Sequence, residues 1–171
     1  MTDSPWLDAG QRRVWLAWMR LQLRMTYEIN RQLQADSALS MADYDVLTGL
    51  NELGGRLPVS ALANHLGWER SRVSHHVKRM ATRGLTVMSP AATDRRVTEV
   101  ALTDHGRTVL ADAAPGHATL VKQLFFGDLP GGDLPALAES LERIYANVLE
   151  NGTLPPPPTG TLRSETDLMG S

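Results

Sequence analysis

Cysteine is absent from the 171-residue sequence. This absence excludes disulfide bonds, a thiol redox switch, and zinc or iron–sulfur sites with cysteine ligands. Long uncharged hydrophobic runs are absent as well. Arg20 and Arg24 interrupt the most apolar N-terminal stretch too early for a secretory signal, and no segment is suited to span a bilayer. We therefore expect a cytoplasmic protein with no membrane partner.

The residue patterns of most enzymes are missing too. The sequence has no cysteine nucleophile and no glycine-rich phosphate loop, and its serines lack a spaced histidine or aspartate partner. We predict no catalysis, no cofactor and no dedicated metal site. Adjacent His75 and His76 would point about 100° apart on a helix, so they cannot form an i, i+4 metal-binding pair. With His65, His105 and His117 elsewhere, a zinc-responsive protein stays open as an alternative.

The net charge is only -2, so the chain as a whole lacks the basic composition that would indicate a nucleic-acid partner. Its distribution is uneven: the segment 68–107 holds eight basic residues against four acidic ones, a net charge of +4. A chain of this length can bury one core, so we expect one domain at 1–152. The remaining 153–171, with four consecutive prolines at 155–158, is predicted to be a disordered tail.

The basic segment begins with an amphipathic pattern over 69–84. Val73, Val77 and Met80 recur at helical spacing on one face, and Gly84 is the expected helix stop. The opposite face suits a DNA groove, because arginine matches the guanine edge and lysine meets phosphate as a point charge. An ordinary solvated helix face is the alternative. The residues predicted to contact DNA from this helix are Arg70, Ser71, Arg72, Ser74, His75, Lys78 and Arg79.

Two shorter helices are predicted ahead of this one. The stretch Ser40–Asp43 is a variant capping box that opens a helix, which Gly54 and Gly55 end. A second helix over 58–66 has proline in its first turn and apolar residues at i, i+3, i+4 and i+7, and Gly67 closes it. Only two residues then separate it from the basic helix. The arrangement predicts a helix-turn-helix.

A β-hairpin is predicted after Gly84, with strands at 85–87 and 97–102 and a polar loop at 89–96. Arg95 and Arg96 lie near its tip, where a basic wing could enter a minor groove beside a major-groove helix. Asp94 would orient a neighbouring arginine, since a carboxylate facing phosphate is repulsive. An ordinary charged turn is the alternative for these three residues.

Long helices are predicted on both sides of this unit. The helix from about Ala9 to Ala35 is apolar around too much of its surface for one small neighbour, which favours burial against a second subunit over a place in a monomer core. Further helices are predicted over about 104–150, with Thr103 as an N-cap, a kink or boundary at Pro115-Gly116, and Asp133 capping the last helix. An organic ligand could bind near Trp15, Trp18 or Tyr44.

Several strings together resemble the MarR family of winged helix-turn-helix transcriptional regulators. They are VSALANHLG at 59–67, SRVS at 71–74, RGL at 83–85, DRR at 94–96 and VALTDHG at 100–106. The resemblance implies a homodimer with intertwined first and last helices, a two-fold DNA site, and often a small effector bound between the dimer helices and the winged helix. It places Ser71, Arg72, Ser74 and His75 toward the groove, Arg96 as the wing arginine and Asp94 as the residue that positions it.

Two residues depart from the family pattern. Glu69 occupies a place that usually holds a serine-like cap, so the helix start is expected to be irregular. His76 occupies a usually aliphatic position and is expected to be half-buried.

These observations predict a mainly α fold with a small β-wing (α+β): a winged helix-turn-helix at about 40–103, flanked by dimerisation helices at about 9–35 and 104–150. The predicted function is a sequence-specific regulator of transcription that binds double-stranded DNA, acting as a ligand-responsive repressor and as a homodimer on an inverted repeat. The alternatives are a zinc-responsive regulator and a winged-helix protein-interaction module that does not bind DNA.

Overall fold

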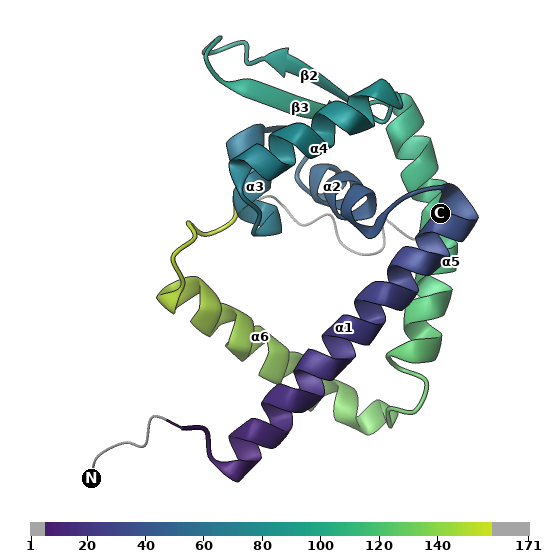
Figure 1. Cartoon of the computed structure of the whole chain (residues 1–171), viewed down its shortest axis with the longest axis vertical. Helices are drawn as coiled ribbons and strands as arrows, with labels where there is room; N and C mark the ends of the chain where they lie inside the picture. Colours follow the sequence, from purple (N-terminus) through teal and green to yellow (C-terminus); the bar gives the residue numbers. More distant parts are fainter. Residues whose placement is uncertain (1–5, 159–171) are drawn as a thin grey trace.

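A computed structural model describes residues 6–158. It is mainly helical with one small antiparallel sheet, which confirms the predicted fold class (Figure 1). The helices are α1 (Ala9–Ser37), α2 (Met41–Glu52), α3 (Val59–Leu66), α4 (Arg70–Thr82), α5 (Asp104–Leu124), the short 3-10 helix η1 (Gly131–Asp133) and α6 (Leu134–Asn151). The strands are β1 (Arg56–Pro58), β2 (Thr86–Pro90) and β3 (Thr98–Leu102), in the sheet order β1-β3-β2.

The hydrophobic core lies where α2, α3, α4 and the sheet meet. Leu47 of α2, Leu62 of α3 and Val77 of α4 are fully buried there, as is Val100 of β3. The end of α1 contributes Leu33, the one buried residue of that helix. Because these side chains come from α1, from α2, α3 and α4, and from the sheet, they join the elements of the winged helix-turn-helix in one continuous core.

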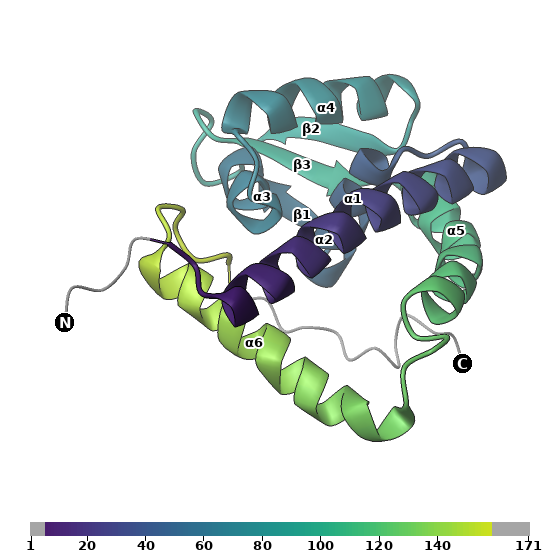
Figure 2. The ribbon, with the colours of Figure 1, turned by 60° about the horizontal axis from the view of Figure 1, so that its bottom comes forward.

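The long helices extend away from this core. In both views α1 and α5 run side by side from the compact part, and α6 lies apart from the core (Figures 1 and 2). No residue of α6 is buried, although one side of the helix is strongly apolar. The surfaces of α1 and α6 are therefore left without apolar partners in a single chain.

The predicted N-caps at Ser40 and Thr103 are present. Ser40 Oγ accepts from the Asp43 amide at 3.0 Å, and the Asp43 carboxylate accepts from the Ser40 amide at 2.9 Å. Thr103 Oγ accepts from the Gly106 amide at 2.9 Å and so caps α5. Gly84 follows α4 with a φ of +72°, the left-handed conformation that glycine adopts without strain.

Gly106 allows the start of α5 to approach the sheet closely. A Cβ at this position would lie inside the contact distance of the Leu85 carbonyl oxygen. Because that oxygen belongs to the backbone, no side-chain rotation could relieve the clash. The string TDHG at 103–106 thus caps the helix through Thr103 and lets it pack closely on the sheet through Gly106.

Three local predictions need correction. Strand β1 was not predicted, and Pro58 is its last residue, so α3 starts at Val59. Of the predicted kink or boundary at Pro115-Gly116, the boundary is wrong, because α5 continues through both residues to Leu124, where packing against α1 outweighs local propensity. Asp133 makes no capping hydrogen bond, since it already belongs to η1.

The proposed division into a domain at 1–152 and a tail at 153–171 stays a prediction. Residues 153–158 form no helix or strand, and residues 159–171 of the predicted tail lie outside the described part of the chain. No helix within residues 6–158 is long and apolar enough to cross a membrane.

Candidate nucleic-acid interface

The turn between α3 and α4 fixes the angle at which α4 is presented. Gly67 ends α3 in a left-handed conformation with φ of +64°, and the Trp68 amide donates to the Ala63 carbonyl at 3.0 Å. Glu69 precedes α4 without a side-chain capping bond, but its backbone is extended and its carbonyl accepts from the Val73 amide at 3.1 Å, so the helix start is regular and not irregular as expected. Val73, Val77 and Met80 are fully buried, which confirms that they form the inner, core-facing side of α4 as predicted.

The outer face of α4 carries the predicted DNA-contacting residues. At about 100° per residue, the positions opposite the buried face are Ser71, His75 and Lys78, whereas Arg72 and Arg79 lie on the flank next to α2. Six of the seven predicted residues are exposed and Ser74 is half-buried. The seven predicted residues therefore cover the outer face of α4 and both of its flanks, with Arg70 and Ser74 on the flank opposite Arg72 and Arg79.

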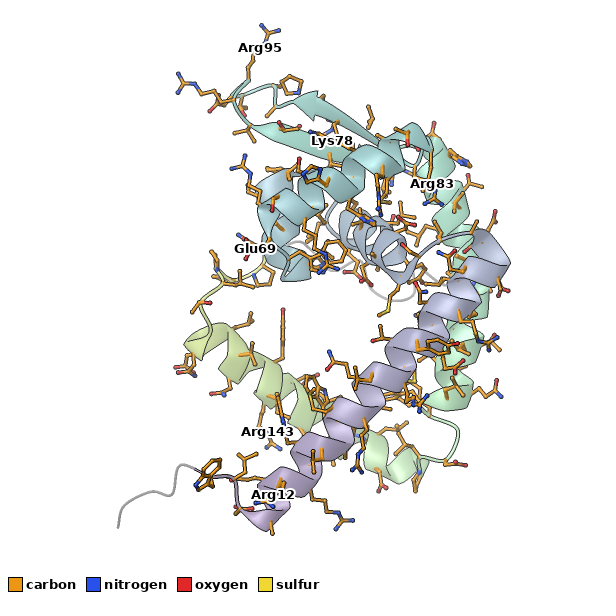
Figure 3. The ribbon with its side chains drawn as sticks, in the orientation of Figure 1. Arg12, Glu69, Lys78, Arg83, Arg95 and Arg143 are labelled. Carbon is orange, nitrogen blue, oxygen red and sulfur yellow. The ribbon has the colours of Figure 1, made fainter. Side chains whose placement is uncertain are left out.

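The β2–β3 hairpin places two more arginines on the same side of the molecule. Figure 3 shows Arg95 at the hairpin tip, beyond the α4 surface that carries Lys78. Asp94, Arg95 and Arg96 are exposed. Asp94 Oδ1 accepts from the Arg96 backbone amide at 2.9 Å, so the carboxylate fixes the turn through the backbone, and no contact with the Arg96 guanidinium was found in the described structure.

A buried polar cluster under α4 was not predicted. Asp43 of α2 lies against His76 and Arg83: Oδ1 is 2.9 Å from His76 Nε2, and Oδ2 accepts from Arg83 Nη1 at 2.8 Å. His76 is only 8% exposed, more deeply buried than the expected half-buried state. Its Nε2 makes no hydrogen bond of regular geometry, so the short contact with Asp43 is electrostatic. We call Asp43, His76 and Arg83 the α2–α4 polar cluster.

The neighbours of His76 indicate which of its ring nitrogens carries the proton. Nδ1 lies 3.2 Å from Arg79 Nη2, and a guanidinium can only donate. Nδ1 therefore accepts, and the ring proton sits on Nε2, next to the Asp43 carboxylate. The sequence signal for this cluster was a histidine where an aliphatic residue is usual, but nothing local connected it with Asp43 or Arg83.

The same cluster controls the ionisation of Asp43. Burial by itself would raise the pKa of this carboxyl, but the contact with His76, the amide of Ser40 and the Arg83 guanidinium outweigh it and hold the pKa far below its ordinary value. Asp45, also on α2, has a pKa raised by burial, and the positive charge of Arg72 partly opposes that shift. Asp43 thus stays ionised beneath the basic helix.

The predicted ligand-binding residues form two separate pairs. Trp15 and Trp18 pack against each other on α1 with ring centroids 5.2 Å apart, while Tyr44 packs on His117 of α5 at 4.7 Å. Near the second pair, His117 Nδ1 and Gln32 Oε1 are buried without a hydrogen-bond partner. Burial lowers the pKa of His117, which favours its neutral form. Among residues 6–158 no group of three acidic or histidine side chains is placed to hold a metal ion.

This geometry is that of a winged helix-turn-helix protein, and comparison with solved structures identifies the family. Sco3205 from Streptomyces coelicolor, a MarR family transcriptional regulator solved in complex with DNA, is 31% identical and has a TM-score of 0.80. The similarity covers 92% of this chain and 98% of Sco3205. The chain belongs to the MarR family of transcriptional regulators.

Two further structures are similar. AbsC, a MarR family regulator from the same organism, is 29% identical with a TM-score of 0.77, covering 85% of this chain and 98% of AbsC. BpsR from Bordetella bronchiseptica, whose DNA binding is regulated by 6-hydroxynicotinic acid, is 24% identical with a TM-score of 0.68, covering 78% of this chain and 98% of BpsR. At that identity the likeness to BpsR concerns the fold alone. No family model and no curated protein sequence matched the chain.

The α2–α4 polar cluster generates a stability prediction. Asp43→Asn should lower the free energy of unfolding by about 1–3 kcal/mol near neutral pH, because buried His76 and the Arg83 guanidinium lose a charged partner. The folded-state pKa lies below the ordinary value of 3.8, so this contribution is complete above that value and is lost as the pH falls toward the folded-state pKa. Urea unfolding should therefore show a smaller difference at about pH 3 than at about pH 7.

The matched control is Asp128→Asn, which removes an exposed carboxylate far along the chain and should leave stability within about 0.5 kcal/mol of the wild type. Equal losses at both pH values would show that the charge of Asp43 is not what stabilises the fold.

Proposed function

We propose that this protein is a sequence-specific regulator of transcription that binds double-stranded DNA as a homodimer and responds to an organic ligand. The observation that carries the proposal is the basic outer face of α4 next to the basic hairpin tip, both on one side of the molecule (Figure 3). An α-helix fits the major groove, and a basic hairpin can reach the neighbouring minor groove. The relative Sco3205, solved with DNA, supports the same interpretation.

The α4 surface has the chemistry for both parts of DNA recognition. Arg72 and Ser71 near its start can bond base edges, and Lys78 and Arg79 further along can meet phosphates. Arg95 and Arg96 would contact the minor groove or its phosphates. The repressor role is the simplest outcome, since a protein seated on promoter DNA blocks access to it.

A second copy of the chain is the proposed partner of α1 and α6. Both helices expose large apolar side chains that have no cover in one chain, and a surface of this kind on a regulator of DNA favours a symmetric dimer. Two copies would present two α4 helices about 34 Å apart, as an inverted repeat requires. The exposed large apolar side chains are Val14, Trp15, Leu16, Trp18, Leu21, Leu23 and Tyr27 on α1 and Leu134, Leu141, Ile144, Tyr145 and Val148 on α6.

The dimer is tested by placing a charge in this surface. Ile144→Asp should shift the protein from dimer to monomer in sedimentation velocity at micromolar concentration, because a carboxylate buried in an apolar interface is strongly unfavourable. Ala146→Asp is the matched control, since Ala146 is exposed on the opposite side of α6 and should leave the dimer intact. A wild-type protein that sediments as a monomer would contradict the proposal.

DNA recognition is tested with duplexes selected from a random pool by the purified protein. Arg72→Ala should weaken binding to the selected duplex by about 1–3 kcal/mol and relax the preference at one base pair, because it removes a bidentate contact. Lys78→Ala should weaken binding to all duplexes alike and reduce the salt slope by about one, as loss of a phosphate contact requires. Fluorescence anisotropy across a salt series measures both effects.

Arg143→Ala is the control for these variants, because Arg143 lies on α6, far from the hairpin (Figure 3). Its DNA affinity should equal that of the wild type. The base-reading role proposed for Arg72 is wrong if Arg72→Ala weakens binding to selected and random duplexes by the same factor. A wild-type protein that enriches no duplex would favour the protein-interaction module instead.

The proposed ligand is an aromatic acid or a phenol that binds near Tyr44 and His117. A neutral His117 can accept from a hydroxyl, and Gln32 Oε1 offers a second unused acceptor nearby. Such a compound should quench tryptophan fluorescence and lower DNA affinity by about 5–150-fold, which corresponds to a coupling of about 1–3 kcal/mol. His117→Ala should weaken binding of the compound. It should leave the DNA affinity measured in the absence of the compound unchanged.

The ligand proposal has its own contrary outcome. The proposal is contradicted if no compound in a panel of aromatic acids and phenols quenches the fluorescence or releases DNA, while added zinc does release DNA. The signal would then be a metal ion and not an organic ligand.

A further inference from the structure

Trp68 contacts two side chains of α4 that lie one helical turn apart. The guanidinium carbon of Arg72 lies 4.0 Å from the centroid of the Trp68 ring. His76 packs on the Trp68 ring in a T-shaped arrangement, with centroids 5.7 Å apart and ring planes at 87°. Trp68 is thus placed between the exposed flank of α4 and its buried interior.

The position of the Trp68 ring is fixed from several directions. Its backbone amide is bonded to Ala63 at the end of α3, and its ring is half-buried against the core. His76, which packs on the Trp68 ring, is itself held by Asp43 on one nitrogen and by Arg79 on the other. The aromatic surface offered to Arg72 is therefore rigid, because each of its supports belongs to a packed element.

This platform limits the orientations of Arg72. An arginine stacked on an aromatic ring directs its N–H donors outward, in the plane of the guanidinium group. There they can donate hydrogen bonds to a base edge. Without the platform, an exposed arginine would have to be ordered when DNA binds.

We propose that Trp68 is a positioning residue for DNA recognition. Its indole holds the Arg72 guanidinium in the orientation that reads a base pair, and it raises sequence specificity without needing to contact DNA. This inference rests on the proposed function, in which Arg72 reads a base. It goes further by assigning part of that specificity to the turn between α3 and α4.

The experiment is a double-mutant cycle measured on the selected duplex and on a random duplex. Trp68→Leu should lower the ratio of the two affinities by about two- to five-fold, the range expected for an exposed cation–π contact. In the Arg72→Ala background the same change should have no further effect on the ratio, because the side chain that the ring positions is already gone. Trp68→Phe should retain most of the ratio, since it keeps an aromatic face.

Lys78 provides the matched control cycle. Trp68→Leu combined with Lys78→Ala should give additive losses, because no contact joins these two side chains in the proposal. A purely structural role for Trp68 predicts instead an equal loss on both duplexes and additivity with Arg72→Ala, and that result would overturn the inference. Thermal unfolding shows whether Trp68→Leu folds. If it does not, Trp68→Phe, which keeps a weaker aromatic contact with Arg72, replaces it in both double-mutant cycles, and the same pattern is expected with smaller changes in affinity.

Failure of this inference can be told apart from failure of the proposed function. A wild-type protein that discriminates between duplexes, with an additive Trp68–Arg72 cycle, refutes only the positioning role. A wild-type protein that does not discriminate refutes both, since there is then no base reading for Trp68 to support.

Discussion

The placement of α4 depends on one buried carboxylate. Asp43 bonds the Ser40 amide at the start of α2, lies against His76 in the middle of α4, and binds Arg83 just after that helix. Apolar side chains tolerate small shifts, because hydrophobic contact has no preferred direction. A buried charge does not, since any movement of α4 along α2 would leave it without its partners. The polar cluster therefore sets the register of a helix that the core only holds in place.

Most of the local structure could be predicted from the sequence, because its causes are local. The inner face of α4, the caps at Ser40 and Thr103 and the hairpin all follow from residues within a few positions of one another. Strand β1 could not be predicted, since three residues become a strand only by pairing with β3, about 43 positions later. The contact between Arg83 and Asp43 could not be predicted either, because the two residues are 40 positions apart. Nor could the continuity of α5 through Pro115, since it depends on packing against α1.

The candidate site divides in the same way. The outer face of α4 and the wing arginines could be identified from residue type and spacing, because an amphipathic helix has only two faces. The contact between Trp68 and Arg72 could not, although the two residues are only four positions apart. Trp68 precedes the helix, and its ring direction is decided by the turn at Gly67 and by His76. Sequence thus located the surface, whereas tertiary contacts determine how its arginines are held.

Helix α2 connects the two parts of the proposed mechanism. Asp43 faces α4 through the polar cluster, and its neighbour Tyr44 packs on His117 of α5. A ligand seated between Tyr44 and His117 would act on the helix that fixes the register of α4, without having to reach the DNA-binding face. It could change DNA affinity only if it bound one placement of α2 more tightly than another. Because the Asp43 contacts hold α2 and α4 together, a shift of α2 would move α4 with it, and in a dimer that movement would alter the distance between the two recognition helices.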